Sequence, residues 1–233
     1  MKIGILKTDA VRPEWVPEFG EYPDMFIRLL GDRDPDLEFS VYDVMLDEYP
    51  ASIDDVDAYL VTGSKFGVYE DLPWIHRLLD FLRELHAHKK KIIGICFGHQ
   101  AIAHALGGRA AKVDAGWGVG LHRHCFTQKP NWFDAGDAEF PVLVSHQDQV
   151  VEIAEGAVTL AGSEFCPNAV CQLGDHILTF QGHPEFVNAY VREIIEFRRA
   201  KIGEETASAG LKSLEGRPAT DRMAAWMLRF LRS

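Results

Sequence analysis

The chain has 233 residues, of which 47% are hydrophobic and 25% are charged, enough to bury the core of one large domain. Its formal net charge of −11 repels phosphate backbones, so we expect no nucleic-acid partner. No apolar run approaches the roughly 18 residues of a membrane span, and the first residues lack the pattern of a signal peptide, so we expect a cytoplasmic protein.

The first half of the chain alternates short apolar runs with helical patterns. Strands are expected at 2–6, 39–44, 58–63 and 91–96, and helices at 22–30, 74–89 and 99–108. The run KIIGIC at 91–96 is almost wholly apolar, which is typical of a central parallel strand. This alternation predicts a parallel sheet with helices on both faces.

The second half contains five short β candidates, at 119–126, 140–146, 157–162, 168–173 and 176–183. We expect some of them to extend the sheet and others to form an antiparallel flap. A helix is expected at 185–202, a polar loop at 203–218, and a last helix starting at Thr220 or Asp221.

The last helix has an apolar side that must be buried somewhere. We expect it to pack on its own domain, with docking on a second copy or on a separate partner as the alternative. The chain is thus interpreted as a single domain, 1–233, with a C-terminal helical extension at 195–233.

The segment GICFGHQ, residues 94–100, places a cysteine between two glycines where an apolar strand meets a helix. This is the pattern of a nucleophile elbow, because glycine leaves room for a sharp turn. The helix after Cys96 directs free N–H groups and its positive end at the sulfur, which favours the reactive thiolate. The N–H of Phe97 can donate to an oxyanion. A buried structural cysteine flanked by chance glycines is the alternative.

Two further segments carry residue types that such a cysteine needs. In QGHPEF, residues 181–186, His183 can exchange a proton with the thiol and the leaving group, and Glu185 can orient the imidazole. In VTGSKF, residues 61–66, Gly63 follows an inner strand and can offer a second amide to the oxyanion. Taken alone, QGHPEF is better interpreted as an ordinary surface loop, and VTGSKF is equally compatible with one.

Together, GICFGHQ, QGHPE and TGSKFGVYEDLPW resemble the three signatures of class I glutamine amidotransferases, over roughly residues 1–190. The chain is similar in particular to the stand-alone members, a group that includes γ-glutamyl peptidases. The resemblance implies a flavodoxin-like three-layer αβα fold with a mostly parallel sheet. It also implies hydrolysis of a γ-glutamyl amide through a γ-glutamyl thioester.

The resemblance implies a role for each matching residue. Cys96 is the nucleophile, His183 the base and acid, and Glu185 its orienting group. Gly63 and Phe97 supply the oxyanion amides.

Three further positions match those that hold the substrate in the family: Gln100, Ser145 and His146. For Ser145 and His146, a strand that simply ends in polar residues is the alternative. Ser64 stands where the family loop often has proline, which points to a substrate other than free glutamine.

Several functions stay open from sequence alone. The chain either hydrolyses a small γ-glutamyl substrate itself or is a glutaminase that delivers ammonia to a separate synthase. A cysteine α/β-hydrolase that uses Asp148 as its acid, or a binding module that only senses glutamine, are further alternatives. Cys166 and Cys171 match no metal spacing, and the chain has no G-x-x-x-x-G-K-[ST] loop, so we expect neither a metal nor a cofactor.

Overall fold

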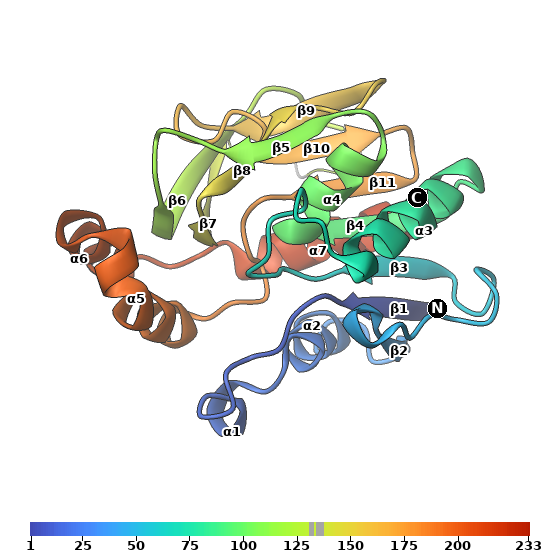
Figure 1. Cartoon of the computed structure of the whole chain (residues 1–233), viewed down its shortest axis with the longest axis horizontal. Coiled ribbons are helices and arrows are strands. Elements are labelled where there is room, and N and C mark those ends of the chain that lie inside the picture. Colours follow the sequence, from blue (N-terminus) through green and yellow to red (C-terminus); the bar gives the residue numbers. More distant parts are fainter. Residues whose placement is uncertain (131–132, 134–137) are drawn as a thin grey trace.

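A nine-stranded mixed sheet runs through the centre of the computed structural model, which describes residues 1–130, 133 and 138–233 (Figure 1). Five of its strands form the parallel half, in the spatial order β2 (Glu38–Asp43), β1 (Lys2–Lys7), β3 (Ala58–Val61), β4 (Lys91–Ile95) and β11 (Ile177–Phe180). The sheet continues with antiparallel strands, β10 (Val170–Leu173), β9 (Ala157–Gly162), β6 (Gly118–Phe126) and β7 (Glu139–His146). The predicted α/β class with a parallel core is confirmed.

Helices cover both faces of the parallel half. On one face, α2 (Tyr22–Gly31) and α7 (Thr220–Arg232) share a core with β1 and β4. On the other face, α3 (Pro73–Ala87) and α4 (Phe97–Ala105) pack over β3 and β4. The apolar side of α7 is buried, with Trp226 only 2% exposed, so this helix packs on its own domain.

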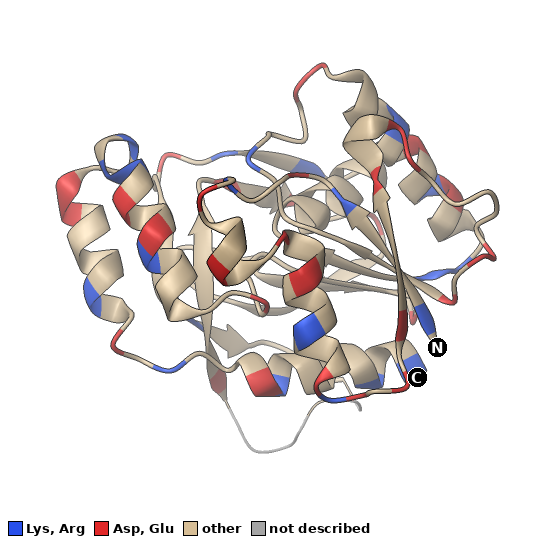
Figure 2. Cartoon of the chain, turned by 90° about the horizontal axis from the view of Figure 1, so that it is seen from below, with Lys and Arg blue, Asp and Glu red and all other residues tan. Residues whose placement is uncertain are grey.

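A second helical group lies beside the antiparallel half. α5 (Asn188–Ile202) and α6 (Glu204–Ser213) stand next to β6 and β7 (Figure 1) and share a core with the short α1 (Val16–Phe19). Figure 2 shows acidic and basic positions interspersed along the helices. None of the helices in the described part of the chain has the length and apolar character that a bilayer crossing requires.

Two expectations differ from the structure. All five β candidates of the second half join the main sheet. The separate two-stranded sheet pairs β5 (Arg109–Lys112) with β8 (Asp148–Glu152), whose short polar sequences gave no apolar run. The segment 203–218, expected to be a polar loop, is largely the helix α6 (Glu204–Ser213). This helix packs small residues against β6 instead of large apolar ones, so a Cβ on Gly210 would lie 2.7 Å from a methyl group of Val119.

Candidate active site

Cys96 occupies a strained turn between β4 and α4. Its φ of 51° and ψ of −100° are rare for a residue with a side chain, and such strain persists only where the surroundings enforce it. The N–H of Cys96 donates to the carbonyl of Phe180 at 2.8 Å, which ties the turn to β11. A Cβ on Gly98 would lie 2.5 Å from the carbonyl oxygen of Val61, and one on Gly94 would lie 2.7 Å from that of Gly98. The two glycines of the motif therefore allow the close approach that the turn needs.

His183 reaches Cys96 because β11 lies parallel to β4, with Phe180 opposite Ile95. The chain after β11 is anchored by the His183 N–H, which donates to the carbonyl of Leu143 at 2.8 Å. The parallel pairing brings the ends of two strands to the same edge of the sheet although they are far apart in sequence. The two motifs that sequence analysis associated are thus neighbours in space.

The imidazole of His183 is held on two sides. Its Nδ1 lies 2.7 Å from Oε1 of Glu185, whose side chain is fully buried. The ring of Phe186 stacks on it in parallel, with the centroids 3.9 Å apart and the planes 3° from each other. With Nδ1 engaged by the carboxylate, Nε2 is the nitrogen left for Cys96.

The electrostatics of this cluster favour a protonated imidazole. Burial lowers the pKa of His183, but the charges of Glu185 and Cys96 and hydrogen bonds to both raise it overall, to about 10. The direction follows from a buried carboxylate at hydrogen-bond distance, which stabilises the imidazolium. A protonated imidazole in this position can give its proton to a leaving group.

Gln181 also contacts the sulfur, and sequence analysis gave it no role. Its Nε2 donates to Sγ of Cys96 at 3.5 Å, and its Oε1 accepts from Nε2 of Gln100 at 3.1 Å. Gln181 stands in the QGHPEF motif, two residues before His183, and this proximity was the feature of the sequence that could have indicated a role for it. Phe186 is in the same motif, and its stacking on His183 was likewise missed.

The two positions expected to form an oxyanion site, Gly63 and Phe97, are close to Cys96. The Cβ position of Gly63 lies 3.6 Å from Cβ of Cys96 and 2.8 Å from Cε1 of His183. Phe97 is the first residue of α4, so its N–H has no acceptor within the helix. Gly63 therefore packs against Cys96, and Phe97 follows Cys96 directly in the chain.

The three expected substrate-binding residues line one cavity of about 430 Å³ together with Cys96. Gln100 donates to the carbonyl of Asp148 at 2.9 Å. Ser145 accepts a hydrogen bond of 3.0 Å from Nη1 of Arg198, a residue on α5 that sequence analysis missed because nothing in its neighbourhood marked it.

His146 is a neutral polar group in the wall of this cavity. Burial lowers its pKa to about 3, and Nδ1 lies 3.1 Å from the carbonyl of Asp148. Its Nε2 has no hydrogen-bond partner among the described residues. That nitrogen is left as a free acceptor.

Asp148, the acid of the alternative hydrolase order, serves elsewhere. Its Oδ2 accepts from the hydroxyl of Tyr69 at 3.0 Å, whereas the carboxylate on His183 is that of Glu185. The geometry favours the Cys96–His183–Glu185 arrangement.

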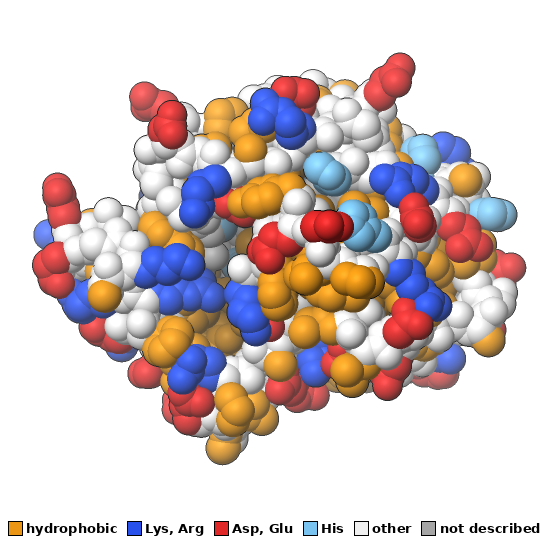
Figure 3. All heavy atoms as spheres, in the orientation of Figure 1, with side chains coloured by type: hydrophobic (Ala, Val, Ile, Leu, Met, Phe, Trp, Pro, Cys, Tyr) orange, Lys and Arg blue, Asp and Glu red, His pale blue; other side chains and the backbone are white. Residues whose placement is uncertain are grey.

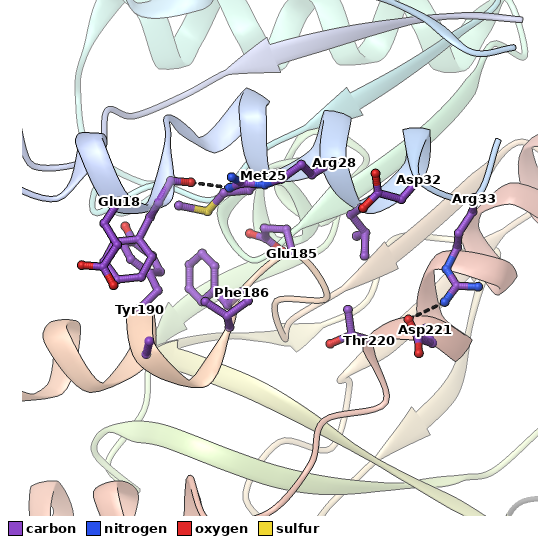
Figure 4. A pocket seen from close by; sticks show the side chains of 14 residues that line it. Glu18, Met25, Arg28, Asp32, Arg33, Glu185, Phe186, Tyr190, Thr220 and Asp221 are labelled. Carbon is purple, nitrogen blue, oxygen red and sulfur yellow. Dashed lines mark hydrogen bonds and ion pairs between the residues drawn. The ribbon is translucent and has the colours of Figure 1, made fainter. Parts of the chain in front are cut away.

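A larger cavity, of about 730 Å³, lies behind this cluster, between α2, the start of α7 and the segment that follows His183 (Figure 4). Glu185 and Phe186 contribute to its wall, but Cys96 does not. The Glu185 side chain is not exposed to it, and its Oε2 has no hydrogen-bond partner among the described residues. Cys96 therefore lines the smaller cavity and not this one.

Comparison with known proteins shows the family of the chain. The model of the class I glutamine amidotransferase family matches residues 24–198. γ-Glutamyl peptidase 2 of Arabidopsis thaliana is 30% identical over 231 residues, which cover 94% of this chain and 91% of the relative. A glutamine amidotransferase-like protein of Schizosaccharomyces pombe is 31% identical over 244 residues, which cover 98% of each chain.

Solved structures have the same fold. A glutamine amidotransferase from Methylobacillus flagellatus superposes with a TM-score of 0.77 at 24% identity, covering 99% of this chain and 92% of its own. A glutamine amidotransferase from Thermotoga maritima gives a TM-score of 0.74 at 18% identity, with 99% and 96% covered. The chain belongs to the class I glutamine amidotransferase family.

Proposed function

We propose that this protein hydrolyses a γ-glutamyl amide by way of a γ-glutamyl thioester on Cys96. The observation that carries the proposal is a cysteine on a strained turn beside a histidine whose other ring nitrogen is bound by a buried glutamate. Relatives of nearly the same length are named γ-glutamyl peptidases, which supports a peptide or conjugate as the substrate.

The chemistry begins with the Cys96 thiolate, which attacks the side-chain carbonyl carbon of the γ-glutamyl group. The N–H groups of Gly63 and Phe97 stabilise the oxyanion that forms. His183 then gives its proton to the leaving nitrogen, the C–N bond breaks and the amine departs. The γ-glutamyl group remains on the sulfur as a thioester.

A water molecule completes the cycle. His183, now neutral, takes a proton from the water as its oxygen attacks the thioester carbon. The C–S bond breaks, glutamate leaves, and the thiolate and imidazolium return to their starting state. Glu185 stabilises the charged imidazole throughout without accepting its proton.

Polar residues around the cavity bind the glutamyl part of the substrate. Gln100, Ser145 and His146 line the cavity that contains the sulfur, and Arg198 bonds to Ser145. Arg198 also lines a small pocket with Cys96 and His183, which makes it our candidate for the α-carboxylate of the γ-glutamyl group.

The test is steady-state hydrolysis of glutamine and γ-glutamyl dipeptides by the isolated chain. Turnover should be abolished by Cys96→Ala and retained by Cys125→Ala, which removes an exposed cysteine outside the site. Acid-quenched reactions should carry a γ-glutamyl adduct on the peptide that contains Cys96. Turnover that appears only after cell extract is added would favour a glutaminase that serves a separate synthase, and turnover by Cys96→Ala would refute the mechanism.

A further inference from the structure

We propose that Lys112 and Lys201 form an outer subsite that binds a carboxylate on the leaving group of the substrate. This inference rests on the proposed function, and it specifies the substrate as a γ-glutamyl peptide with a free C-terminal carboxylate. It comes from the distribution of charge and aromatic side chains around the cavity that contains Cys96.

The cavity is electropositive although the chain as a whole is acidic. Its lining includes four basic side chains, Lys65, Lys112, Arg198 and Lys201, and two acidic ones, Glu70 and Asp148, in a chain of net charge −11. Figure 3 shows Lys and Arg side chains gathered around a hollow on this face of the molecule. Basic groups concentrated at a cleft attract anionic substrates.

The acidic side chains of the lining are already engaged. Oε1 of Glu70 accepts from the N–H of Gly67 at 2.6 Å, and Asp148 accepts from Tyr69. Nζ of Lys65 pairs with Asp9 at 2.8 Å, which neutralises that lysine. Glu70 and Asp148 keep their charge in these hydrogen bonds. Apart from the Lys65–Asp9 pair, the lining thus carries three cations, Arg198, Lys201 and Lys112, against two anions.

Two of these cations converge on one aromatic ring. Arg198 and Lys201 are three residues apart on α5, so they lie on the same side of the helix. Cζ of Arg198 lies 5.8 Å and Nζ of Lys201 lies 5.4 Å from the centroid of Trp117. Like charges so close to one ring repel each other, and an anion between them and Lys112 would relieve that repulsion.

The two lysines lie outside the pocket nearest the sulfur. Arg198 lines both the small pocket around Cys96 and the 430 Å³ cavity, whereas Lys112 and Lys201 line the 430 Å³ cavity and not the small pocket. Lys112 comes from β5 and Lys201 from α5, so two separate parts of the chain supply them. With the glutamyl carboxylate assigned to Arg198, the outer lysines meet the part of the substrate beyond the scissile bond.

The size of the cavity fits such a substrate. Its volume of about 430 Å³ lies within the range of pockets that enclose small organic ligands. The exposed rings of Tyr69 and Phe197 at its lining leave room for an apolar side chain on the leaving group. A γ-glutamyl dipeptide would place its terminal carboxylate at this outer end.

The experiment compares γ-glutamylglycine with γ-glutamylglycinamide, which differ in the terminal charge and little in size. At low ionic strength kcat/KM should be about threefold to tenfold higher for γ-glutamylglycine, and the ratio should fall as salt is added. Lys112→Gln and Lys201→Gln should each lower the ratio, and Lys201→Glu should bring it to one or below. Lys212→Gln, at an exposed lysine on α6 outside the cavity, is the control and should keep the wild-type ratio.

Two results separate this inference from the proposed function. Equal kcat/KM values for the two compounds, unaffected by salt or by the lysine variants, would overturn the subsite and leave γ-glutamyl hydrolysis standing. If neither compound is turned over, calorimetry on the Cys96→Ala protein can compare the affinities of γ-glutamylglycine and γ-glutamylglycinamide instead of their kcat/KM values. Equal affinities there would overturn the subsite independently of any activity.

Discussion

Replacing Gly63 with alanine tests whether the position of the His183 ring controls the proposed reaction. The added Cβ would lie 2.8 Å from Cε1 of His183, whereas an ordinary contact begins at 3.4 Å. The imidazole must therefore move by about 0.6 Å, the difference between these two distances. The φ angle at Gly63 is not in the positive region, so the substitution strains the packing and not the backbone.

The ring has little freedom to absorb this shift. Phe186 stacks on it, Glu185 binds Nδ1 at 2.7 Å, and the backbone of His183 is bonded to Leu143. A misplacement of about 1 Å in a reacting group can cost roughly a hundredfold in rate, so we expect kcat/KM to fall about tenfold to a hundredfold. Overpacking should lower the free energy of unfolding by about 1–3 kcal/mol, which leaves the protein folded.

The assay is γ-glutamyl hydrolysis together with urea unfolding of the same preparations. The matched control is Gly31→Ala, where the new Cβ has no neighbour closer than Phe39 at 4.0 Å. It should keep full activity and wild-type stability or better. A folded Gly63→Ala protein with kcat/KM within twofold of wild type would refute the argument that His183 must stay where it is.

Three other substitutions or conditions test the site and the fold. Glu185→Gln should lower kcat, but by less than Cys96→Ala, because the carboxylate orients the base and carries no proton; unchanged kinetics would contradict its role. Burial lowers the pKa of His99 and of His146 to about 3, so the unfolded chain binds more protons as pH falls below about 6.5. Their contribution to the free energy of unfolding is therefore complete above pH 6.5 and is lost as the pH falls toward 3. At pH 5 the loss should be on the order of 2 kcal/mol for each histidine. Urea unfolding at pH 8 and at pH 5 would measure it. The free energy of unfolding should depend less on pH in the His99→Asn protein. Equal stability of the wild-type protein at both pH values would contradict the reasoning. Deleting residues 219–233 removes α7 from the core, so circular dichroism should show a protein that no longer unfolds cooperatively, and an intact thermal transition would argue against cis packing.

Much of the fold was predictable because its signals are local. The apolar runs of the parallel half and the stripe on α3 mark elements that bury a whole face, and these were found. The elbow around Cys96 was visible because the turn requires glycines at fixed positions. By contrast, α6 packs small residues closely against β6, and no hydrophobic periodicity marks such a helix.

The candidate site was predicted only as far as its motifs extend. Cys96, His183 and Glu185 stand in two short segments of the sequence. These segments are close in space because β11 pairs with β4, and no local sequence pattern predicts that pairing. Arg198 and Trp117 come from parts of the chain with no motif, and only the packing of α5 beside the antiparallel strands brings them to the cavity. The charge around the cavity likewise cannot be read from the sequence, where the basic residues are scattered.

The pairing of β4 with β11 also has a consequence for the synthesis of the protein. β3 and β4 leave the ribosome early. β11, which covers the other edge of β4, is made only after the six strands β5 to β10. Until then an apolar strand edge lies open beside Cys96, and such edges associate with other chains. A nascent or truncated chain that ends before Ile177 therefore has an aggregation-prone edge and no histidine beside its thiol. Cys96 and His183 come together only once β11 and the segment after it have been made, so a chain that ends before His183 leaves Cys96 without this neighbour.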